Sequence, residues 1–521
     1  MQTNGDQQNG VKRTSREREQ VAIIGAGVSG LAAGNIWRQF GYEVTIFEAS
    51  DSVGGQWNTT YPGVRLQNTA PQYQFADFPW PFSPDRHPTG EQIRRYMHAA
   101  ADAFDVHLCL KHEVTRLEET EGGWKIEVNG QPRNETFAYV IIATGQYPGG
   151  AKKWLPPFPG IEKFQGKVLT NIDSQAVFDD RRVVVIGFGK TALDYAAWSA
   201  PRAKRTTYVF RTPRWTIPDY LLGICFTRPF FARFGSDMMT SWVYSSAPQK
   251  FLHRYQAGVV KAFWWFIAKL FAFQHRRNAP LNGRPRSVLD TVIPPKSQFV
   301  SDLRSATALA PDDYYYHVAH QGIDAKRDSI AAFDEQGVIL SGGERIEADV
   351  VCVCVGNEAP SYPYLPERYR SLLEQQAGGP ALYRHLIHPE IPRLGFAGYN
   401  HGFLHIALCE VGALWSAAAL RGDLELPSVA EMKASAERVS RWKQDHSAYE
   451  STFNLAVNTR YQQYIDILLQ DLGLSQWRKL PNIPAEIFLR YDPTDYRGIV
   501  PEFQRLRKRR PAAPVVQPVD A

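Results

Sequence analysis

VAIIGAGVSGLAAGNIWRQFGYEVTIFE, residues 21–48, is the stretch of this sequence that decides the fold. Its apolar start predicts a short buried strand, the glycine-rich turn leads into a helix, and its end predicts a second strand. Gly25 permits the tight turn, Gly27 lets the backbone approach a phosphate, and Gly30 lets the helix pack closely on the strand. The pattern predicts a dinucleotide site with its pyrophosphate at the helix N-terminus.

The pattern occurs a second time at residues 182–200, RVVVIGFGKTALDYAAWSA. Gly187 and Gly189 fill the first two glycine positions, and Ala192 fills the third, as the motif allows. An apolar strand again precedes the turn, and a helix follows it. Two nucleotide sites in one chain predict a relay, in which hydride enters from a nicotinamide and is stored on a flavin.

The residue that ends the second strand of each unit indicates which nucleotide binds there. Glu48 follows the first glycine turn by about twenty residues, where a carboxylate accepts hydrogen bonds from ribose hydroxyls. An acid disfavours a 2′-phosphate, so the first site suits FAD or NAD. The corresponding strand of the second unit ends in Arg211, with Arg214 nearby. A cation suits a 2′-phosphate, so the second site is expected to bind NADPH, although an arginine at a strand end can also be structural.

We therefore expect an α/β protein with two Rossmann-like dinucleotide-binding domains, a helical insertion and a helical C-terminal region. The FAD domain is expected to be discontinuous, because the chain makes the NADPH domain before it returns. The expected bounds are 1–20 for a disordered leader, 21–165 and 361–430 for the FAD domain, 166–360 for the NADPH domain with its insertion at 212–290, 431–495 for the helical region and 496–521 for a loose tail.

Composition narrows the function classes further. The chain has 521 residues and a formal net charge of +6, an excess too mild to indicate nucleic-acid binding. Its cysteines form no CxxC pair, which argues against a disulfide reductase and fits a reducing compartment such as the cytoplasm. No metal site is expected, and the polar N-terminus has no apolar core typical of a signal peptide.

Other segments extend the pattern beyond the glycine turns: VGGQW at 53–57, IIATGQY at 141–147, and LGFAGYN at 394–400 followed by EVGALWS at 410–416. Together they resemble the class B flavoprotein monooxygenases, and within these the flavin-containing monooxygenases, from about residue 21 to about residue 430. The resemblance implies FAD and NADPH as cofactors. It assigns to cofactor binding a further set of residues: Gly55, Gln56, Trp57, Thr144, Gly145, Gly398 and Glu410.

The segment YPGVRLQNTAPQYQFADFPWP, residues 61–81, is similar to the family segment that carries a functional asparagine. The resemblance places Asn68 near the flavin carbon that receives O₂, as a catalytic residue. A neutral amide can hydrogen-bond there without adding a charge. The alternative is that Asn68 satisfies a turn, as asparagine often does.

One family signature is incomplete. FQGKVLTNIDS keeps Phe164 and Gly166, but Thr170 stands where the family has histidine and Ser174 where it has an aromatic residue. An intact signature is typical of the Baeyer–Villiger branch, so the departure weakens that function. GFGKTALD and RTPRWTIPDYLLG also resemble plant members that N-hydroxylate a cyclic amino acid.

The resemblance implies a reaction in which NADPH reduces FAD, O₂ adds to the flavin as a C4a-hydroperoxide, and an amine or sulfide takes one oxygen atom. Three alternatives stay open: Baeyer–Villiger oxidation of a ketone, an NADPH oxidase that releases H₂O₂, and a non-catalytic nucleotide-binding scaffold. His401 and His405, in GYNHGFLHIAL, are expected near the flavin end of the sheet, as structural residues or as proton donors.

The insertion contains an apolar stretch at 256–277 that predicts a helix. Lys261, Lys269 and Arg276 fall within one arc of it, and Trp265 departs from the pattern. The stretch is expected to be shorter than the ~20 residues that span a membrane. It could cap a substrate channel, lie on a membrane surface or form a homodimer contact. The apolar residues expected on the opposite side are Val259, Phe263, Trp264, Phe266, Ile267, Leu270 and Phe271.

Overall fold

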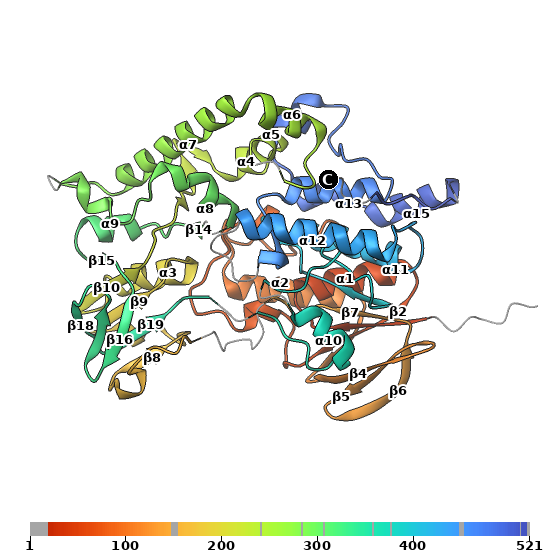
Figure 1. Cartoon of the computed structure of the whole chain (residues 1–521), viewed down its shortest axis with the longest axis horizontal. Helices are drawn as coiled ribbons and strands as arrows, with labels where there is room; N and C mark the ends of the chain where they lie inside the picture. The colour runs from red at the N-terminus through yellow and green to blue at the C-terminus, as the bar shows by residue number, and fades with distance from the viewer. Residues whose placement is uncertain are drawn as a thin grey trace, which may run out of the picture.

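Two parallel five-stranded sheets organise the molecule, and they lie side by side in Figure 1. The computed structural model describes residues 19–146, 155–239, 242–282, 285–305, 308–356, 359–375, 378–446, 453–510 and 512–517. Most of the expected leader, residues 1–20, lies outside these ranges, and Gln20 already belongs to the first strand.

The first sheet has the strand order β20-β7-β1-β2-β3, and every pair in it is parallel. Its strands are β1 (Gln20–Ile24), β2 (Glu43–Glu48), β3 (His107–Leu110), β7 (Tyr139–Ile142) and β20 (Leu394–Phe396). The side chains of β1 alternate between the faces, as a strand buried on both sides requires.

Val21 and Ile23 join the core shared with helices on one face of this sheet. Those helices are α1 (Val28–Gln39), α2 (Gly90–Phe104) and α11 (His405–Leu420). Ala22 and Ile24 face a second core, which a small antiparallel sheet and one helix complete. That layer consists of β4 (Val114–Thr120), β5 (Gly123–Val128), β6 (Gln131–Phe137) and α10 (Glu367–Glu374).

The second sheet repeats this three-layer plan, with the parallel strand order β15-β10-β9-β19-β8. Val183 and Val185 pack in the core that the helices share, whereas Val184 and Ile186 pack toward an antiparallel hairpin sheet. The duplicated plan confirms the predicted fold class. The elements are β8 (Lys167–Leu169), β9 (Arg182–Ile186), α3 (Lys190–Ser199), β10 (Arg205–Phe210), α9 (Tyr314–Ala319), β15 (Asp324–Arg327), β16 (Ile330–Asp334), β17 (Gly337–Leu340), β18 (Arg345–Glu347) and β19 (Val350–Val353).

Between β10 and β15 the chain forms a mostly helical insertion, which lies along the top of the molecule in Figure 1. Its described strands form two short pairs, which are β11 (Thr216–Ile217) with β14 (Ala308–Leu309), and β12 (Tyr220–Leu221) with β13 (Ile224–Cys225). Its helices are α4 (Thr227–Phe230), α5 (Arg233–Asp237), α6 (Ala247–Tyr255), α7 (Ala257–Asn278) and α8 (Phe299–Ser305).

Helix α7 corrects two expectations about the stretch at 256–277. It has 22 residues, so it is not shorter than a membrane span. The expected division into apolar and basic sides is also wrong, because Val259 and Phe266 are exposed together with Trp265 and Lys269. The helix is apolar around most of its circumference, so periodicity alone does not determine which apolar residues face inward.

The C-terminal region is helical, with α12 (Val429–His446), α13 (Tyr461–Asp471), α14 (Ile483–Phe488) and one short strand, β22 (Ala456–Asn458). The expected loose tail at 496–521 is wrong for its described part, because residues 499–509 form helix α15. Ile499, Val500 and Phe503 are buried on one side of α15, and Val516 is buried beyond it. The basic run conceals this apolar stripe in the sequence, since it occupies the exposed side of the same helix.

Candidate functional site

The first glycine turn joins β1 to α1 and is shaped by close backbone contacts. A Cβ atom on Gly25 would lie 2.6 Å from the carbonyl oxygen of Ala143, and one on Gly30 would lie 1.9 Å from that of Gly25. Gly25 also has a φ of +108°, which L side chains rarely adopt. Gly27 is the N-cap of α1, and no side chain caps it. The first N–H groups of the helix are therefore available to an anion.

Glu48 lies at the carboxyl end of β2, beside this turn. One carboxylate oxygen accepts a 2.7 Å hydrogen bond from the Ala26 backbone N–H. The other accepts bonds from the backbone N–H and hydroxyl of Ser50, at 2.9 and 2.8 Å. These bonds fix the carboxylate next to the glycine turn, where the sequence predicts a ribose contact.

The segment Gly55–Asn58 forms a 3-10 helix that meets the first turn. A Cβ on Gly55 would lie 3.0 Å from the Cα of Gly27, so only glycine permits this approach. Gln56 is exposed, and the indole N–H of Trp57 donates to the hydroxyl of Tyr73 at 2.8 Å. The structure therefore brings Gly55 against the turn, and Gln56 and Trp57 follow it in the same 3-10 helix.

Two other predicted groups approach the same region from later in the chain. Thr144 and Gly145 follow β7 after the single residue Ala143 and are exposed, while Tyr147 of the same motif lies outside the described residues. Gly398 packs on the start of α1, because a Cβ there would meet the Ser29 hydroxyl at 2.4 Å.

Glu410 is buried within α11 and accepts hydrogen bonds from the backbone N–H of Ala76 at 3.0 and 3.2 Å. Burial raises the pKa of this carboxyl to about 8. The hydrogen bonds from Ala76 anchor the segment that follows Asn68 to helix α11.

The second turn has the same features. A Cβ on Gly187 would lie 2.2 Å from the Cys354 carbonyl oxygen, whereas one on Gly189 would meet nothing within 4 Å. Gly189 is the N-cap of α3 without a side-chain cap, and Ala192 is fully buried. Arg211 follows β10, is exposed, and forms no ion pair with another described residue. The turn and the cation are thus open to a ligand.

A contact that the sequence does not predict joins the two units. The hydroxyl of Tyr61, in the segment after β2, donates to Asp194 on α3 at 2.8 Å, and Lys190 pairs with the same carboxylate at 2.6 Å. Burial raises the pKa of Asp194, while Lys190 and the two hydrogen bonds oppose that shift. The spacing of Lys190 and Asp194 is a helical i,i+4 signal, but Tyr61 carries no comparable one.

Asn68 lies where three distant segments meet. Its side-chain N–H donates to the backbone carbonyl of Phe403. The neighbouring Gln67 accepts a 2.9 Å hydrogen bond from the Leu309 N–H, in β14 of the insertion. The Phe403 ring packs on Phe230 of the insertion, with ring centroids 5.3 Å apart.

His401 and His405 flank this contact, with ring centroids 4.7 Å apart. Burial lowers the pKa of His401 to about 4 and lowers that of His405 well below its ordinary value. Both rings are therefore neutral at pH 7. The thiol of Cys409 lies 3.7 Å from Nε2 of His405 and 3.2 Å from the Ser29 hydroxyl, which links the pair to α1.

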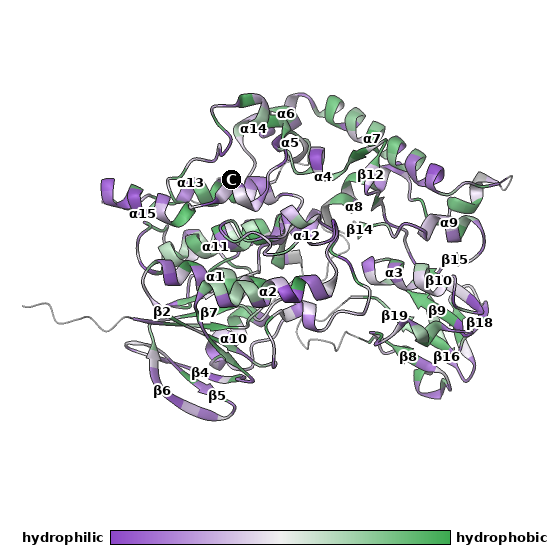
Figure 2. Cartoon of the chain, turned by 180° about the vertical axis from the view of Figure 1, so that it is seen from behind, coloured by the Kyte–Doolittle hydropathy of each residue, from purple (hydrophilic) through white to green (hydrophobic). Residues whose placement is uncertain are grey.

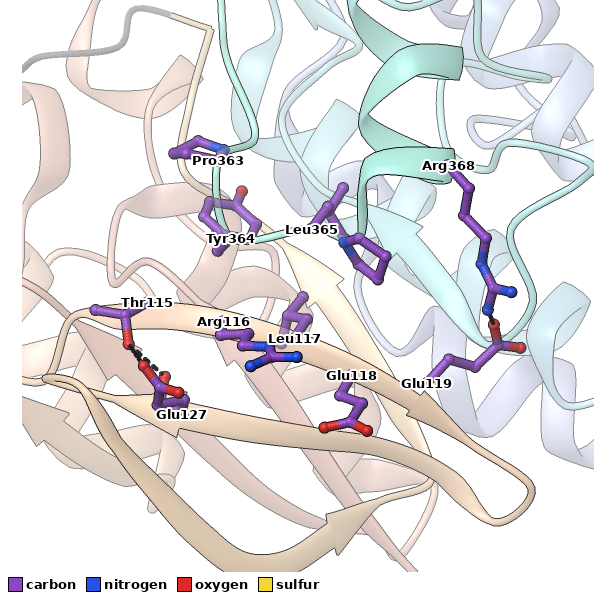
Figure 3. A pocket seen from close by; sticks show the side chains of 11 residues that line it. Thr115, Arg116, Leu117, Glu118, Glu119, Glu127, Pro363, Tyr364, Leu365 and Arg368 are labelled. Carbon is purple, nitrogen blue, oxygen red and sulfur yellow. Dashed lines mark hydrogen bonds and ion pairs between the residues drawn. The ribbon is translucent and has the colours of Figure 1, made fainter.

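Two cavities lie away from both glycine turns. A groove of about 520 Å³ lies between β4–β5 and residues 363–368, and Figure 3 shows its charged lining, including Glu119 paired with Arg368. A second, of about 550 Å³, lies beside Arg205 and Asp324, at the starting ends of β10 and β15. Ligands of such sheets bind at the carboxyl ends of the strands, and neither lining includes a residue of the glycine turns. In the part of the chain that the structure describes, no group of three or more His, Cys, Asp or Glu could hold a metal ion.

The residues present fit two dinucleotides. Both glycine-rich helix N-termini lack a side-chain cap, and a carboxylate or an unpaired cation ends the strand beside each. The fold and site define a two-dinucleotide oxidoreductase.

Comparison with known proteins identifies the class more closely. The flavin-binding monooxygenase-like family model matches residues 18–234. "Probable flavin-containing monooxygenase 1" of Arabidopsis thaliana is 30% identical, over 92% of this chain and 96% of that protein. The chain belongs to the flavin-containing monooxygenase family and is an FAD- and NADPH-dependent flavoprotein oxidoreductase.

Two solved structures have the same fold. The S-allyl-L-cysteine S-oxygenase from Allium sativum has a TM-score of 0.58 at 19% identity, covering 95% of this chain and 94% of that chain. Cyclohexanone monooxygenase with bound epsilon-caprolactone has a TM-score of 0.63 at 18% identity, covering 87% of this chain and 97% of that chain. Because proteins with this fold carry out more than one kind of oxygenation, the fold alone does not determine the reaction of this chain.

Proposed function

We propose that this monooxygenase transfers one oxygen atom from O₂ to a nitrogen or sulfur atom of a small organic substrate. The observation that carries the proposal is the position of the Asn68 side-chain amide beside the segment that contains two uncharged histidines. The amide is held by the Phe403 carbonyl, and burial keeps the adjacent His401 and His405 uncharged. Oxygen transfer to an amine or sulfide needs hydrogen bonding and exclusion of water, but no strong base.

Asn68 is proposed as the catalytic residue, because its amide can orient the reacting oxygen or the substrate without adding charge. Bound FAD, reduced by NADPH, supplies the electrons that activate O₂. The Phe403 carbonyl would hold one N–H of the Asn68 amide, which fixes the direction in which the second N–H points.

The proposed cofactor contacts follow the two turns. For FAD they are Gly25, Gly27, Gly30, Glu48, Gly55, Gln56, Trp57, Thr144, Gly145, Gly398 and Glu410. For NADPH they are Gly187, Gly189, Ala192 and Arg211. Uncapped helix N–H groups would hold each pyrophosphate, Glu48 the ribose of FAD, and Arg211 the 2′-phosphate of NADPH. The corresponding domains are proposed at 21–165 with 361–430, and at 166–360.

A ketone substrate is less well supported than an amine or sulfide. Ketone oxidation proceeds through an anion that benefits from a nearby cation, and His401 and His405 cannot supply one at neutral pH. At the incomplete signature, Ser174 accepts a hydrogen bond from the Ala176 N–H and caps a short 3-10 helix. That residue therefore has a local structural role in place of the family's aromatic side chain.

We propose that the chain acts in the cytoplasm. All five cysteines are free, which fits a reducing compartment. Fractionation of cells that produce the tagged chain would test this, and recovery only from an oxidising compartment would contradict it.

A panel of paired substrates tests the reaction type. The purified protein would be given an amine, a sulfide and a ketone of similar size, with NADPH, oxygenated product and H₂O₂ measured together. We expect product from the amine or sulfide and little from the ketone. An ester from the ketone as the main product would instead support the Baeyer–Villiger reaction.

A further inference from the structure

Helix α7 exposes a stripe of large apolar side chains on the outside of the molecule. Trp265, Phe266 and Phe273 are 51%, 54% and 55% exposed, and Val259 lies in line with them. Val259, Phe266 and Phe273 recur every seven residues, which is about two helical turns, so they lie in line on one side of the helix, and Trp265 lies next to Phe266. Exposed aromatic residues in such a row indicate an interaction surface.

The opposite side of α7 is anchored in the protein. Val260, Trp264, Ala268 and Phe271 are buried, and the Trp264 indole N–H donates to the Met238 carbonyl at 2.7 Å. Among the described residues, α7 is the helix that is long and apolar enough to cross a membrane. If α7 crossed a membrane, these buried residues would have to leave the core. The helix can therefore only lie on a membrane surface.

Neighbouring elements extend the stripe. Phe234 of α5 packs on Phe263 of α7 and on Phe488 of α14, with ring centroids 6.0 and 5.7 Å apart. At the other end, the backbone N–H of Leu222, in the β12–β13 hairpin, donates to Gln274 of α7 at 3.2 Å. Figure 2 shows α14, α6, α7 and β12 along the same edge of the molecule. We call this surface the outer face; its exposed apolar residues are Leu222, Ile224, Phe234, Phe251, Tyr255, Val259, Trp265, Phe266, Phe273, Ile483, Phe488 and Leu489.

The charge of the outer face is of one sign along α6 and α7. The sequence between Asp237 and Asp290 contains no acidic residue. Its exposed cations on the two helices are Lys250, Arg254, Lys261, Lys269 and Arg277. The Lys269 ammonium lies 3.5 Å from the centroid of the Trp265 ring, so cations and aromatic rings share the surface.

We propose that the outer face docks on an anionic lipid bilayer, with α7 lying parallel to the membrane in its headgroup region. Aromatic and aliphatic side chains would enter the acyl boundary, and the lysine and arginine side chains would reach the phosphate groups. A symmetric contact with a second copy fits less well, because it would bring two acid-free basic helices together.

Vesicle sedimentation tests this proposal with the full-length, FAD-containing protein. The probes are vesicles of phosphatidylcholine alone and vesicles that also contain phosphatidylserine, whose negative charge attracts basic segments. The test variant is Trp265→Glu/Phe266→Glu. The matched control is Val429→Glu/Val515→Glu, which changes charge equally at exposed apolar residues outside the outer face. FAD content and melting temperature verify that both variants fold.

We expect the wild type and the control to bind phosphatidylserine vesicles, and the test variant to bind about tenfold or more weakly, since two apolar contacts are lost. Binding should fall with added salt. Wild type that stays in the supernatant, or a test variant that binds equally well, would overturn the proposal. So would a wild-type dimer that the test variant converts to monomer without any vesicle binding, because the occupant would then be a second copy.

Discussion

The side-chain amide of Asn68 donates a hydrogen bond to the backbone carbonyl of Phe403, 335 residues further along the chain. This bond joins the segment after the first nucleotide turn to the residues between His401 and the start of helix α11 at His405. Gln67 adds a bond to the insertion through Leu309. The candidate reaction site is thus made from three parts of the chain, and Asn68 is where they meet.

Substitution of Asn68 tests its catalytic role. Asn68→Ala should keep FAD and its reduction by NADPH, yet lose oxygenated product and release more H₂O₂, because the amide that directs oxygen transfer is gone. Product and H₂O₂ are measured per NADPH consumed. Gln67→Ala, which removes the neighbouring contact with Leu309, is the matched control and should keep more of the product. If the Asn68 variant instead loses FAD or solubility with no change in product per flavin, Asn68 is a structural turn residue.

Mutations in the two glycine turns should affect the binding of FAD and of NADPH separately. Cβ atoms at Gly27 and Gly189 meet nothing closer than 3.7 Å, so both valine variants should fold. Gly27→Val should purify without FAD, because the side chain would fill the pyrophosphate space. Gly189→Val should keep FAD but need much more NADPH for flavin reduction. Stoichiometric FAD in Gly27→Val would show that the pyrophosphate lies elsewhere.

Arg211 should determine the preference for NADPH. Arg211→Ala removes an exposed cation that pairs with the 2′-phosphate, so the KM for NADPH should rise about ten- to a hundredfold, while that for NADH stays nearly constant. Initial rates with both nucleotides give the comparison, and Arg211→Lys should retain part of the preference. Equal effects on the two nucleotides would contradict the assignment.

Glu410 should make stability depend on pH. Burial raises the pKa of its carboxyl in the folded protein to about 8, against an ordinary value of 4.5. Between these values the folded state keeps a proton that the unfolded state releases, so this contribution to stability is full below about pH 4.5 and is lost as pH rises to about 8.

Urea unfolding at pH 6 and pH 8.5 measures that loss. Glu410→Gln, which cannot titrate, should reduce the difference between the two pH values, whereas Glu425→Gln at an exposed carboxylate should leave it unchanged. An identical difference in wild type and Glu410→Gln would show that Glu410 does not carry this dependence.

The sequence predicts best where local rules decide the structure. Glycine positions with a strained φ or a close backbone contact, such as Gly25 and Gly187, can be predicted from the sequence because few other residues fit there. Contacts between segments that are distant in the chain cannot be predicted from the sequence in this way. Nothing local connects Asn68 with Phe403, which meet only when the discontinuous first unit is assembled, or Tyr61 with Asp194, which meet only when the two units come together.

The sequence also misleads where one pattern conceals another. The basic run of the last helix hides the apolar stripe at Ile499, Val500 and Phe503. Helix α7 is apolar on nearly all sides, so the inward face is decided by packing against its neighbours. In both cases tertiary contacts, which the sequence does not display, determine the outcome.

The stoichiometry of a single assay tests the central claim most directly. The purified, FAD-containing protein would be supplied with NADPH, O₂ and an amine or sulfide that stimulates NADPH use, and product would be analysed by mass. The account predicts about one N- or S-oxygenated product per NADPH consumed, with little H₂O₂. If H₂O₂ matched NADPH consumption for every amine and sulfide in the panel, oxygen transfer to nitrogen or sulfur would be contradicted.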